Sequence, residues 1–349
     1  MMTAANTHST GSLDANGQKA TLRKWLLFGL AVVTSCAWHV FPVSAEEPAK
    51  EPAKEPAKEA VVTDSTKKDC RYEGIGEKSN GGASGMELFP ENDLFRPLWA
   101  DPKQPQQFMS VHATQVRGPQ RSHFNMWSVG FGDNFGLVGK RNGCNGWQVG
   151  ILPAVFAQFD LDSGSTDLIN ADYVVGIPVS FRSGLFSGRM RLFHQSSHLG
   201  DEFILNNPGV TRVGLSYEVL EAILSLDAPG GWGRVYAGGA TAIHVTPSDI
   251  DPNSVHWGFE LRGPTMAAPL LAKPMPGTRL TPVFGSDFQA FEELNWTINT
   301  NVIGGLEWSK VGSDRRLRLL VSYYHGYSPY GQFFGTKLEM VGGGVYVSF

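Results

Sequence analysis

Two residue types that can act together as base and nucleophile stand close to each other in one short stretch of the chain. His194 and Ser196 are separated by a single residue. If this stretch is a strand, both side chains lie on one face, with Cα atoms about 6.6 Å apart, close enough for a hydrogen bond between imidazole and hydroxyl. A histidine in this role also needs an orienting partner. Asp201 is the candidate, with Asn206 or Asn207 as alternatives.

The same residues allow plainer interpretations. Serine and histidine near the end of a strand are ordinary rim residues, and the segment 196–201 (Ser-Ser-His-Leu-Gly-Asp) also fits a turn. A metal site is the weakest alternative, because His194 and His198 lie about 13 Å apart on an extended strand and share a metal only on a helix. These residues therefore predict no metal ligand and no bound cofactor.

The flanking residues indicate which way this strand faces. Met190 and Leu192 share the face of His194, whereas Arg189 and Arg191 take the opposite face. In a membrane β-barrel the apolar residues face lipid and the charged residues face the lumen. The catalytic candidates would then lie on the lipid side of the barrel, near its rim.

The clearest sign of such a barrel is the alternation from Leu294 to Trp308. One face carries Leu294, Trp296, Ile298, Val302, Leu306 and Trp308, and the other carries Asn295, Thr297, Asn299, Asn301 and Glu307. This period of two is typical of a strand with one apolar face. The segment would span about 45 Å fully extended, which suits a tilted strand that crosses a bilayer.

Similar alternation recurs in other segments, and together they predict about a dozen strands. It is strong in 316–324 and 341–349 and weaker in 172–181, 212–226 and 234–244. The 41 Gly and 21 Phe suit many strands with tight turns. A mean hydropathy of -0.16 excludes a helical membrane protein, and a net charge of -4 gives no reason to expect a nucleic-acid partner. We predict an all-β fold, an antiparallel outer-membrane β-barrel of about twelve strands.

The N-terminal segment is typical of an exported protein. Arg23 and Lys24 precede an apolar run, and a small-residue cleavage site ends at Ala45, so 1–45 is the expected signal peptide. Cys36 allows an alternative lipoprotein signal. Three Glu-Pro-Ala-Lys copies follow, and their prolines disfavour a helix, so 46–85 is expected to be a disordered linker before a barrel domain at 86–349.

Two other features fit an exported chain. Cys70 and Cys144 are left after cleavage, and in an oxidising compartment they could pair, which sequence alone leaves open. The last residue, Phe349, is aromatic and closes an alternating strand. That ending resembles the signal by which the barrel assembly machinery receives its substrates, so this machinery is an expected partner, together with outer-membrane lipid.

Two resemblances add to this interpretation. The His194-Gln195-Ser196 arrangement is similar to the site of outer-membrane phospholipase A. That resemblance implies a twelve-stranded barrel, hydrolysis of lipid esters, calcium as cofactor and an active dimer.

The second resemblance covers nearly all of the mature chain from Leu88. The motif 94–102 (Leu-Phe-Arg-Pro-Leu-Trp-Ala-Asp-Pro) resembles one in a bacterial family named domain of unknown function twelve-oh-seven, as do 194–202, 323–326 and 332–334. The chain is identified as a member of that family, which implies an envelope location and a barrel but no established activity.

The sequence therefore leaves two functional classes. One is an outer-membrane barrel that hydrolyses lipid esters through His194 and Ser196. The other is a non-catalytic barrel, either a structural element or a narrow pore, and strand number does not separate the two classes. The oligomeric state stays open.

Overall fold

The structure is a computed structural model that describes residues 84–90, 93–117, 122–210, 212–270, 273–310 and 315–348, with side chains described at all of these except 84, 268–270 and 273–276. The expected signal peptide, the alternative lipidation site Cys36, most of the expected linker, Cys70 and Phe349 lie outside the described residues. Cys144 is disulfide-bonded, and its pairing with Cys70 stays a prediction.

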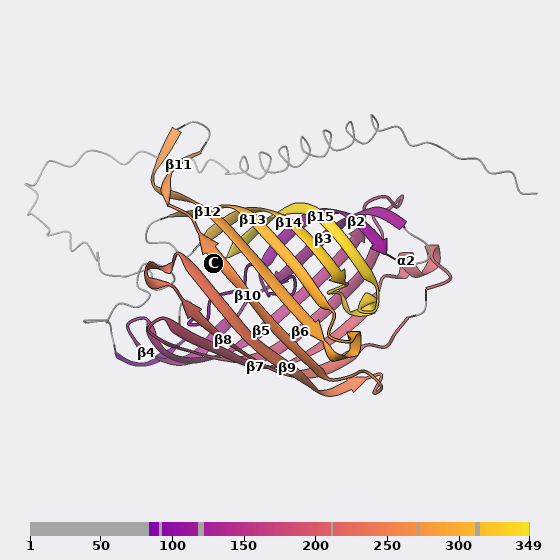
Figure 1. Cartoon of the computed structure of the whole chain (residues 1–349), viewed down its shortest axis with the longest axis horizontal. Helices are drawn as coiled ribbons and strands as arrows, with labels where there is room; N and C mark the ends of the chain where they lie inside the picture. Colours follow the sequence, from indigo (N-terminus) through magenta and orange to yellow (C-terminus); the bar gives the residue numbers. More distant parts are fainter. Residues whose placement is uncertain are drawn as a thin grey trace, which may run out of the picture. The chain divides into compact units, whose positions relative to one another are not determined.

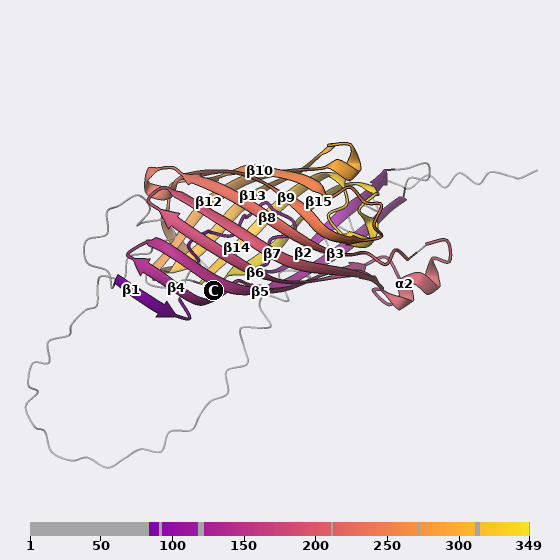
Figure 2. The ribbon, with the colours of Figure 1, turned by 90° about the horizontal axis from the view of Figure 1, so that it is seen from below.

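The described residues form a closed antiparallel β-barrel (Figures 1 and 2). Its strands are β2 (Gln107–Arg117), β3 (Ser122–Gly132), β5 (Asn145–Asp160), β6 (Leu168–Ser183), β7 (Phe186–Leu199), β8 (Ser216–Asp227), β9 (Gly233–Thr246), β10 (Asn253–Arg262), β12 (Lys273–Phe291), β13 (Ile298–Lys310), β14 (Arg316–Tyr327) and β15 (Lys337–Ser348). Pairing of β15 with β2 and of β5 with both β3 and β6 closes this ring of twelve strands. The predicted fold class and strand number are confirmed.

The remaining elements lie beside this ring. β4 (Phe135–Asn142) continues the line of β3 along β5, and β1 (Ser84–Leu88) pairs with its outer edge. β11 (Met266–Leu270) forms a hairpin with the start of β12. The helical segments are α2 (Asp201–Asn206), η1 (Pro229–Gly231), η2 (Glu292–Leu294) and η3 (Gly331–Phe333). None of the helices in the described ranges has the length and apolar character to cross a membrane.

The barrel has an apolar exterior and a charged interior, as the alternation predicts. On β14, Leu319 and Val321 are 44% and 68% exposed, whereas Arg316 and Arg318 on the opposite face are both 4% exposed. A soluble protein would place these residues the other way round, with the apolar face inside. This inversion is typical of a barrel surrounded by lipid.

One predicted strand begins later than expected. β13 starts at Ile298, whereas the alternation placed its start at Leu294. Leu294 ends η2, and Asn295 and Trp296 have positive φ angles of 52° and 56°. Left-handed residues cannot continue a pleated strand, so the turn between β12 and β13 uses these residues. From Ile298 onward the predicted faces hold.

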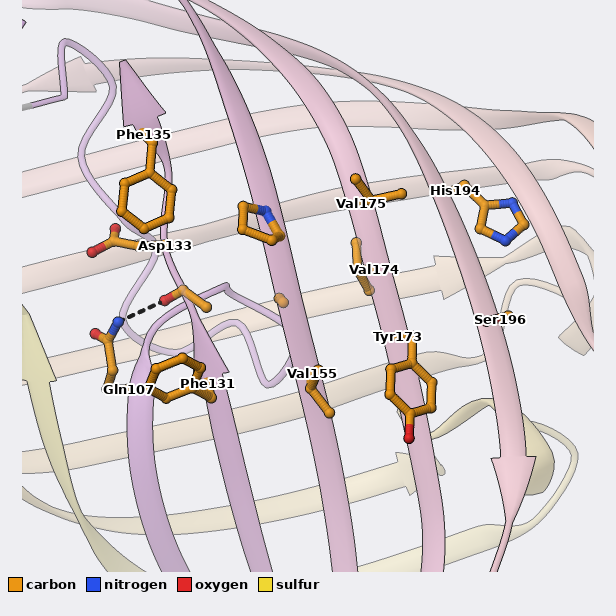
Figure 3. A pocket seen from close by; sticks show the side chains of 13 residues that line it. Gln107, Phe131, Asp133, Phe135, Val155, Tyr173, Val174, Val175, His194 and Ser196 are labelled. Atoms are coloured by element: carbon orange, nitrogen blue, oxygen red, sulfur yellow. Dashed lines mark hydrogen bonds between the residues drawn. The ribbon is translucent and has the colours of Figure 1, made fainter. Parts of the chain in front are cut away.

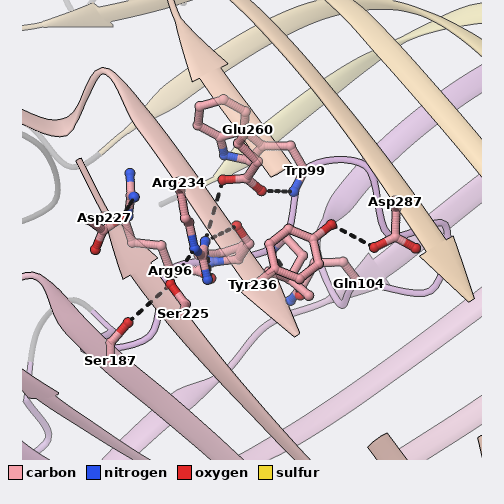
Figure 4. Close-up of polar contacts among 12 residues, drawn as sticks. Arg96, Trp99, Gln104, Ser187, Ser225, Asp227, Arg234, Tyr236, Glu260 and Asp287 are labelled. Carbon is pink, nitrogen blue, oxygen red and sulfur yellow. Dashed lines mark hydrogen bonds and ion pairs between the residues drawn. The ribbon is translucent and has the colours of Figure 1, made fainter. Parts of the chain in front are cut away.

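The segment Leu94–Gln106, which we call the plug, lies inside the barrel. Phe95, Leu98 and Ala100 are at most 2% exposed. The carboxylate of Asp227 forms ion pairs with Arg96 of the plug and with Arg182 of β6. These residues anchor the first half of the plug (Figure 4).

Further polar contacts hold the rest of the plug. Glu260 of β10 accepts the backbone N–H of Trp99 at 2.7 Å. The ammonium group of Lys103 donates to Asp172 of β6 at 2.5 Å. Across the lumen, the buried Glu307 also pairs with several arginines of the wall. The plug is therefore bonded to several strands of the wall inside the lumen.

The three glycines 342–344 allow close packing where the barrel closes. A Cβ added at Gly342 would lie 2.0 Å from the carbonyl oxygen of Val111 on β2. No side chain larger than hydrogen fits at that distance. The glycine at this position therefore lets β15 pack closely against β2.

Candidate functional site

His194 and Ser196 lie on the outer face of β7, as predicted. The residues that alternate with them, Gln195 and Ser197, face the lumen and are both 3% exposed. Met190 and Leu192 continue the outer face toward the other end of the strand and are about half exposed. The predicted register of this strand is therefore confirmed.

Glu218 is the hydrogen-bond partner of His194. The two residues are directly paired across β7 and β8, and His194 Nδ1 lies 2.8 Å from Glu218 Oε1. A carboxylate at neutral pH only accepts, so Nδ1 carries the proton, and Nε2 is left as the acceptor. Glu218 thus selects the tautomer in which His194 can act as a base.

A second histidine holds the other oxygen of the same carboxylate. His244 Nδ1 lies 2.9 Å from Glu218 Oε2, and His244 is paired with Glu218 across β8 and β9. The pairing register shifts just beyond this point, which marks an irregularity of the kind common beside functional sites. The carboxylate is therefore fixed from both sides.

None of the three predicted orienting residues is shown bonded to His194 in the described part of the chain. Asp201 is the first residue of α2. Asn206 donates its amide to Asp167 at 2.6 Å, and Asn207 donates to the carbonyl oxygen of Phe203. Hydrogen bonds from Ser165 and then from Asn206 hold the pKa of Asp167 below its usual range. The structure thus brings His194 together with Glu218, and places Asp201 and Asn206 at the two ends of α2 with Asn207 just after it.

Sequence reasoning missed Glu218 because a long loop separates it from His194 in the chain. A signal was nevertheless present in the sequence. Glu218 shares its strand face with Leu220 and Leu224, which are outward and exposed. A charged residue that continues an apolar strand face is a candidate for function, since burying a charge against lipid is costly.

Ser197 points into the barrel and anchors the wall to the plug. Its hydroxyl donates to Asp172 Oδ1 at 2.5 Å and lies 3.0 Å from Asn170 Oδ1. Asp172 is the same carboxylate that pairs with Lys103 of the plug. The two adjacent serines therefore have separate environments, and only Ser196 shares a face with His194.

An apolar groove of about 310 Å³ lies in the outer wall beside Ser196 (Figure 3). Two rows of paired residues cross β7, β6, β5 and β3. One row is Ser196, Tyr173, Val155 and Phe131, and the other is His194, Val175 and Pro153, whose carbonyl accepts the N–H of Asp133. Val155, Pro153 and Val175 have shorter side chains than Tyr173 and Phe131, and the groove lies beside them between Ser196 and Phe131.

The site is suited to nucleophilic attack on an apolar ester. Ser196 is the nucleophile candidate, His194 the base and Glu218 the orienting carboxylate, which is the logic of a catalytic triad. In the part of the chain that the structure describes, no hydrogen bond joins Ser196 to His194. Such contacts are often loose without substrate and tighten in the complex.

The residues at this site do not fit a calcium ion. Within the described ranges there is no group of three His, Cys, Asp or Glu side chains that could hold a metal. Both oxygens of Glu218 bond imidazoles, and calcium requires six or more oxygen ligands. We derive no step through calcium.

One protein family and several solved outer-membrane proteins are similar to this chain. A family model described as "Protein of unknown function (DUF1207)" matches residues 42–349, and no curated protein matches the chain. Outer-membrane phospholipase A of Escherichia coli is similar at 13% identity and a TM-score of 0.44, over 70% of this chain and 94% of that one.

Two other solved structures are similar at the same level. The calcium-bound phospholipase dimer of Salmonella typhi has 14% identity and a TM-score of 0.45, over 71% of this chain and 93% of that one. The β domain of the Bordetella autotransporter BrkA has 13% identity and a TM-score of 0.38, over 70% and 99%. Such low TM-scores carry no conclusion about the activity of this chain.

Proposed function

This chain belongs to the DUF1207 family of proteins of unknown function, and we propose that it is an outer-membrane lipid-ester hydrolase. Because the family description gives no activity, the proposal rests on the residues of this chain. The observation that carries this proposal is the 2.8 Å hydrogen bond from His194 to Glu218, on the outer face that Ser196 shares, at one end of an apolar groove.

The outer surface of the barrel supports a location in lipid. Large apolar side chains are exposed on strand after strand, including Ile177, Met190 and Leu224 at 57%, 50% and 50%. Trp147 and Trp232, near the end of the barrel opposite to α2, are 39% and 60% exposed, as expected for aromatic residues at a membrane interface. A closed barrel satisfies its backbone hydrogen bonds internally, which lipid requires.

The site lies at the boundary between apolar and polar wall. On β8 the outward residues change from leucine at 220, 224 and 226 to Glu218, and on β7 they change from Leu192 to His194. An acyl ester occupies the same boundary in a bilayer, with its chain in the hydrocarbon and its oxygens toward water. The position of the site at this boundary and the chemistry of Ser196, His194 and Glu218 therefore both favour a lipid ester as the substrate.

In the proposed reaction, Ser196 Oγ attacks the ester carbonyl while its proton moves to His194 Nε2. Glu218 accepts the hydrogen bond from His194 Nδ1–H and stabilises the imidazolium. His194 then gives this proton to the alcohol oxygen as the bond between that oxygen and the carbonyl carbon breaks, so the alcohol leaves and the acyl group stays bound to Ser196 Oγ as an ester. A water molecule, activated by His194 in the same way, releases the fatty acid and restores Ser196.

The plug inside the lumen makes an open pore the weaker alternative. The plug residues Arg96, Trp99 and Lys103 each bond a different strand of the wall. These contacts lie across the path that a solute would take. A non-catalytic structural barrel is the remaining alternative, and the assay below separates it from the hydrolase.

The proposal is tested with purified, refolded protein and mixed micelles of phospholipid, with calcium and with a chelator. Ser196→Ala, His194→Ala and Glu218→Gln should each lower the rate, the first two by at least about 100-fold, because base assistance is typically worth about 10²–10⁴-fold.

The matched control is Ser216→Ala. Ser216 is paired with Ser196 on the adjacent strand and is of the same type, and its loss should leave the rate unchanged. Absence of hydrolysis by the wild type in both conditions would overturn the proposal. A rate that follows Ser216 instead of Ser196 would overturn the assignment of the nucleophile.

A further inference from the structure

The two ends of the apolar groove lie at different depths, measured along the strands from the end of the barrel that carries α2. Glu218 lies two residues from Ser216, where β8 meets its loop, and His194 lies five residues from Leu199, the corresponding end of β7. Gly132, at the other end of the groove, lies ten residues from Ser122, the corresponding end of β3. The groove therefore descends from the polar boundary toward the middle of the apolar wall.

We propose that this groove binds the acyl chain of the ester substrate and sets which chain lengths are hydrolysed. The inference rests on the proposed function. The carbonyl end would lie at Ser196, and the chain would descend over Tyr173 and Val155 toward Phe131. A lipid tail takes this same direction in a bilayer, away from the headgroup and into the hydrocarbon.

The length of the groove follows from strand geometry. From β7 to β3 there are three steps between neighbouring strands, or about 14 Å at roughly 4.8 Å per step. Val155 lies two steps from Ser196, so a long acyl chain passes over it, whereas a chain of four carbons ends before it. Filling the groove at Val155 should therefore discriminate by length.

The variant that tests this is Val155→Trp, and its matched control is Val149→Trp. Both valines are outward residues of β5, but only Val155 lines the groove. The substrates are p-nitrophenyl butyrate and p-nitrophenyl palmitate in the same detergent micelles. Val155→Trp should lower the palmitate rate about tenfold or more, as overpacking of an apolar site does, and should leave the butyrate rate within about twofold.

The outcomes separate this inference from the proposed function. If the wild type hydrolyses neither ester, the proposed function fails. If hydrolysis depends on Ser196 but Val155→Trp gives the same ratio of palmitate to butyrate rates as Val149→Trp, the groove does not bind the chain. A loss of both rates in Val155→Trp alone would also overturn the inference, because a short chain does not reach that position.

Discussion

The ion pair between plug and wall leads to a sharp prediction about stability. Asp227→Asn removes a negative charge that pairs with both Arg96 and Arg182. The side chains of Asp227, Arg96 and Arg182 are 0%, 4% and 3% exposed. Water therefore cannot replace the lost carboxylate, and a buried pair broken on one side costs about 3–5 kcal/mol.

The matched control is an ion pair on the outside of the same barrel. Glu339 forms an ion pair with Arg117, and the side chains of Glu339 and Arg117 are 25% and 46% exposed. Exposed pairs contribute about 0–1 kcal/mol, so Glu339→Gln should have little effect. The two substitutions make the same chemical change at the two extremes of burial.

The measurement is reversible urea unfolding in lipid vesicles, followed by tryptophan fluorescence. Asp227→Asn should lower the free energy of unfolding by at least about 3 kcal/mol, a change of roughly 150-fold in the unfolding equilibrium. The double variant Arg96→Met with Asp227→Asn should recover part of the loss, since it removes one of the uncompensated charges. Equal shifts below about 1 kcal/mol for Asp227→Asn and Glu339→Gln would refute the reasoning.

Three further predictions follow from the barrel and its outer site. In planar bilayers the wild type should show no stable conductance steps, because the plug lies in the lumen and is bonded to its wall, and regular steps would contradict this. Gly342→Ala should destabilise the barrel by about 1–3 kcal/mol in the same urea assay through its clash with Val111, whereas Gly335→Ala, which has open space, should be nearly neutral. His244→Ala should slow ester hydrolysis less than Glu218→Gln does, because Glu218 still holds His194; an equal loss would show that His244 itself takes part.

The sequence predicted the barrel because its strongest signal is local. Alternation in β14 and β15 needs only the period of a strand and the polarity of its two faces, and both predictions agree with the structure. The error at Leu294 has the same origin. Trp296 fits the apolar phase of the pattern, but a turn places it in the left-handed region, and a hydrophobic pattern carries no information on φ.

The site was predictable only in part, for a reason that concerns distance along the chain. His194 and Ser196 lie two residues apart, so strand geometry alone places them together. Glu218 and Val155 reach the same site through pairing between strands, and the register of that pairing depends on loops whose lengths do not reveal it. The position of the plug was also not predicted, because no pattern in residues 94–106 indicates that this segment enters the lumen.

The position of the plug in the chain has a consequence for how the barrel assembles. The plug leads directly into β2, and β2 must find β15 at the other end of the barrel sequence. Contacts of such high sequence separation make folding slow. The plug precedes β2 in the sequence and bonds β6 and β10. If the middle strands pair first, they can bind the plug and so bring β2 close to β15, with which it pairs. Binding of the plug inside the barrel and pairing of β2 with β15 would then occur in the same step of folding.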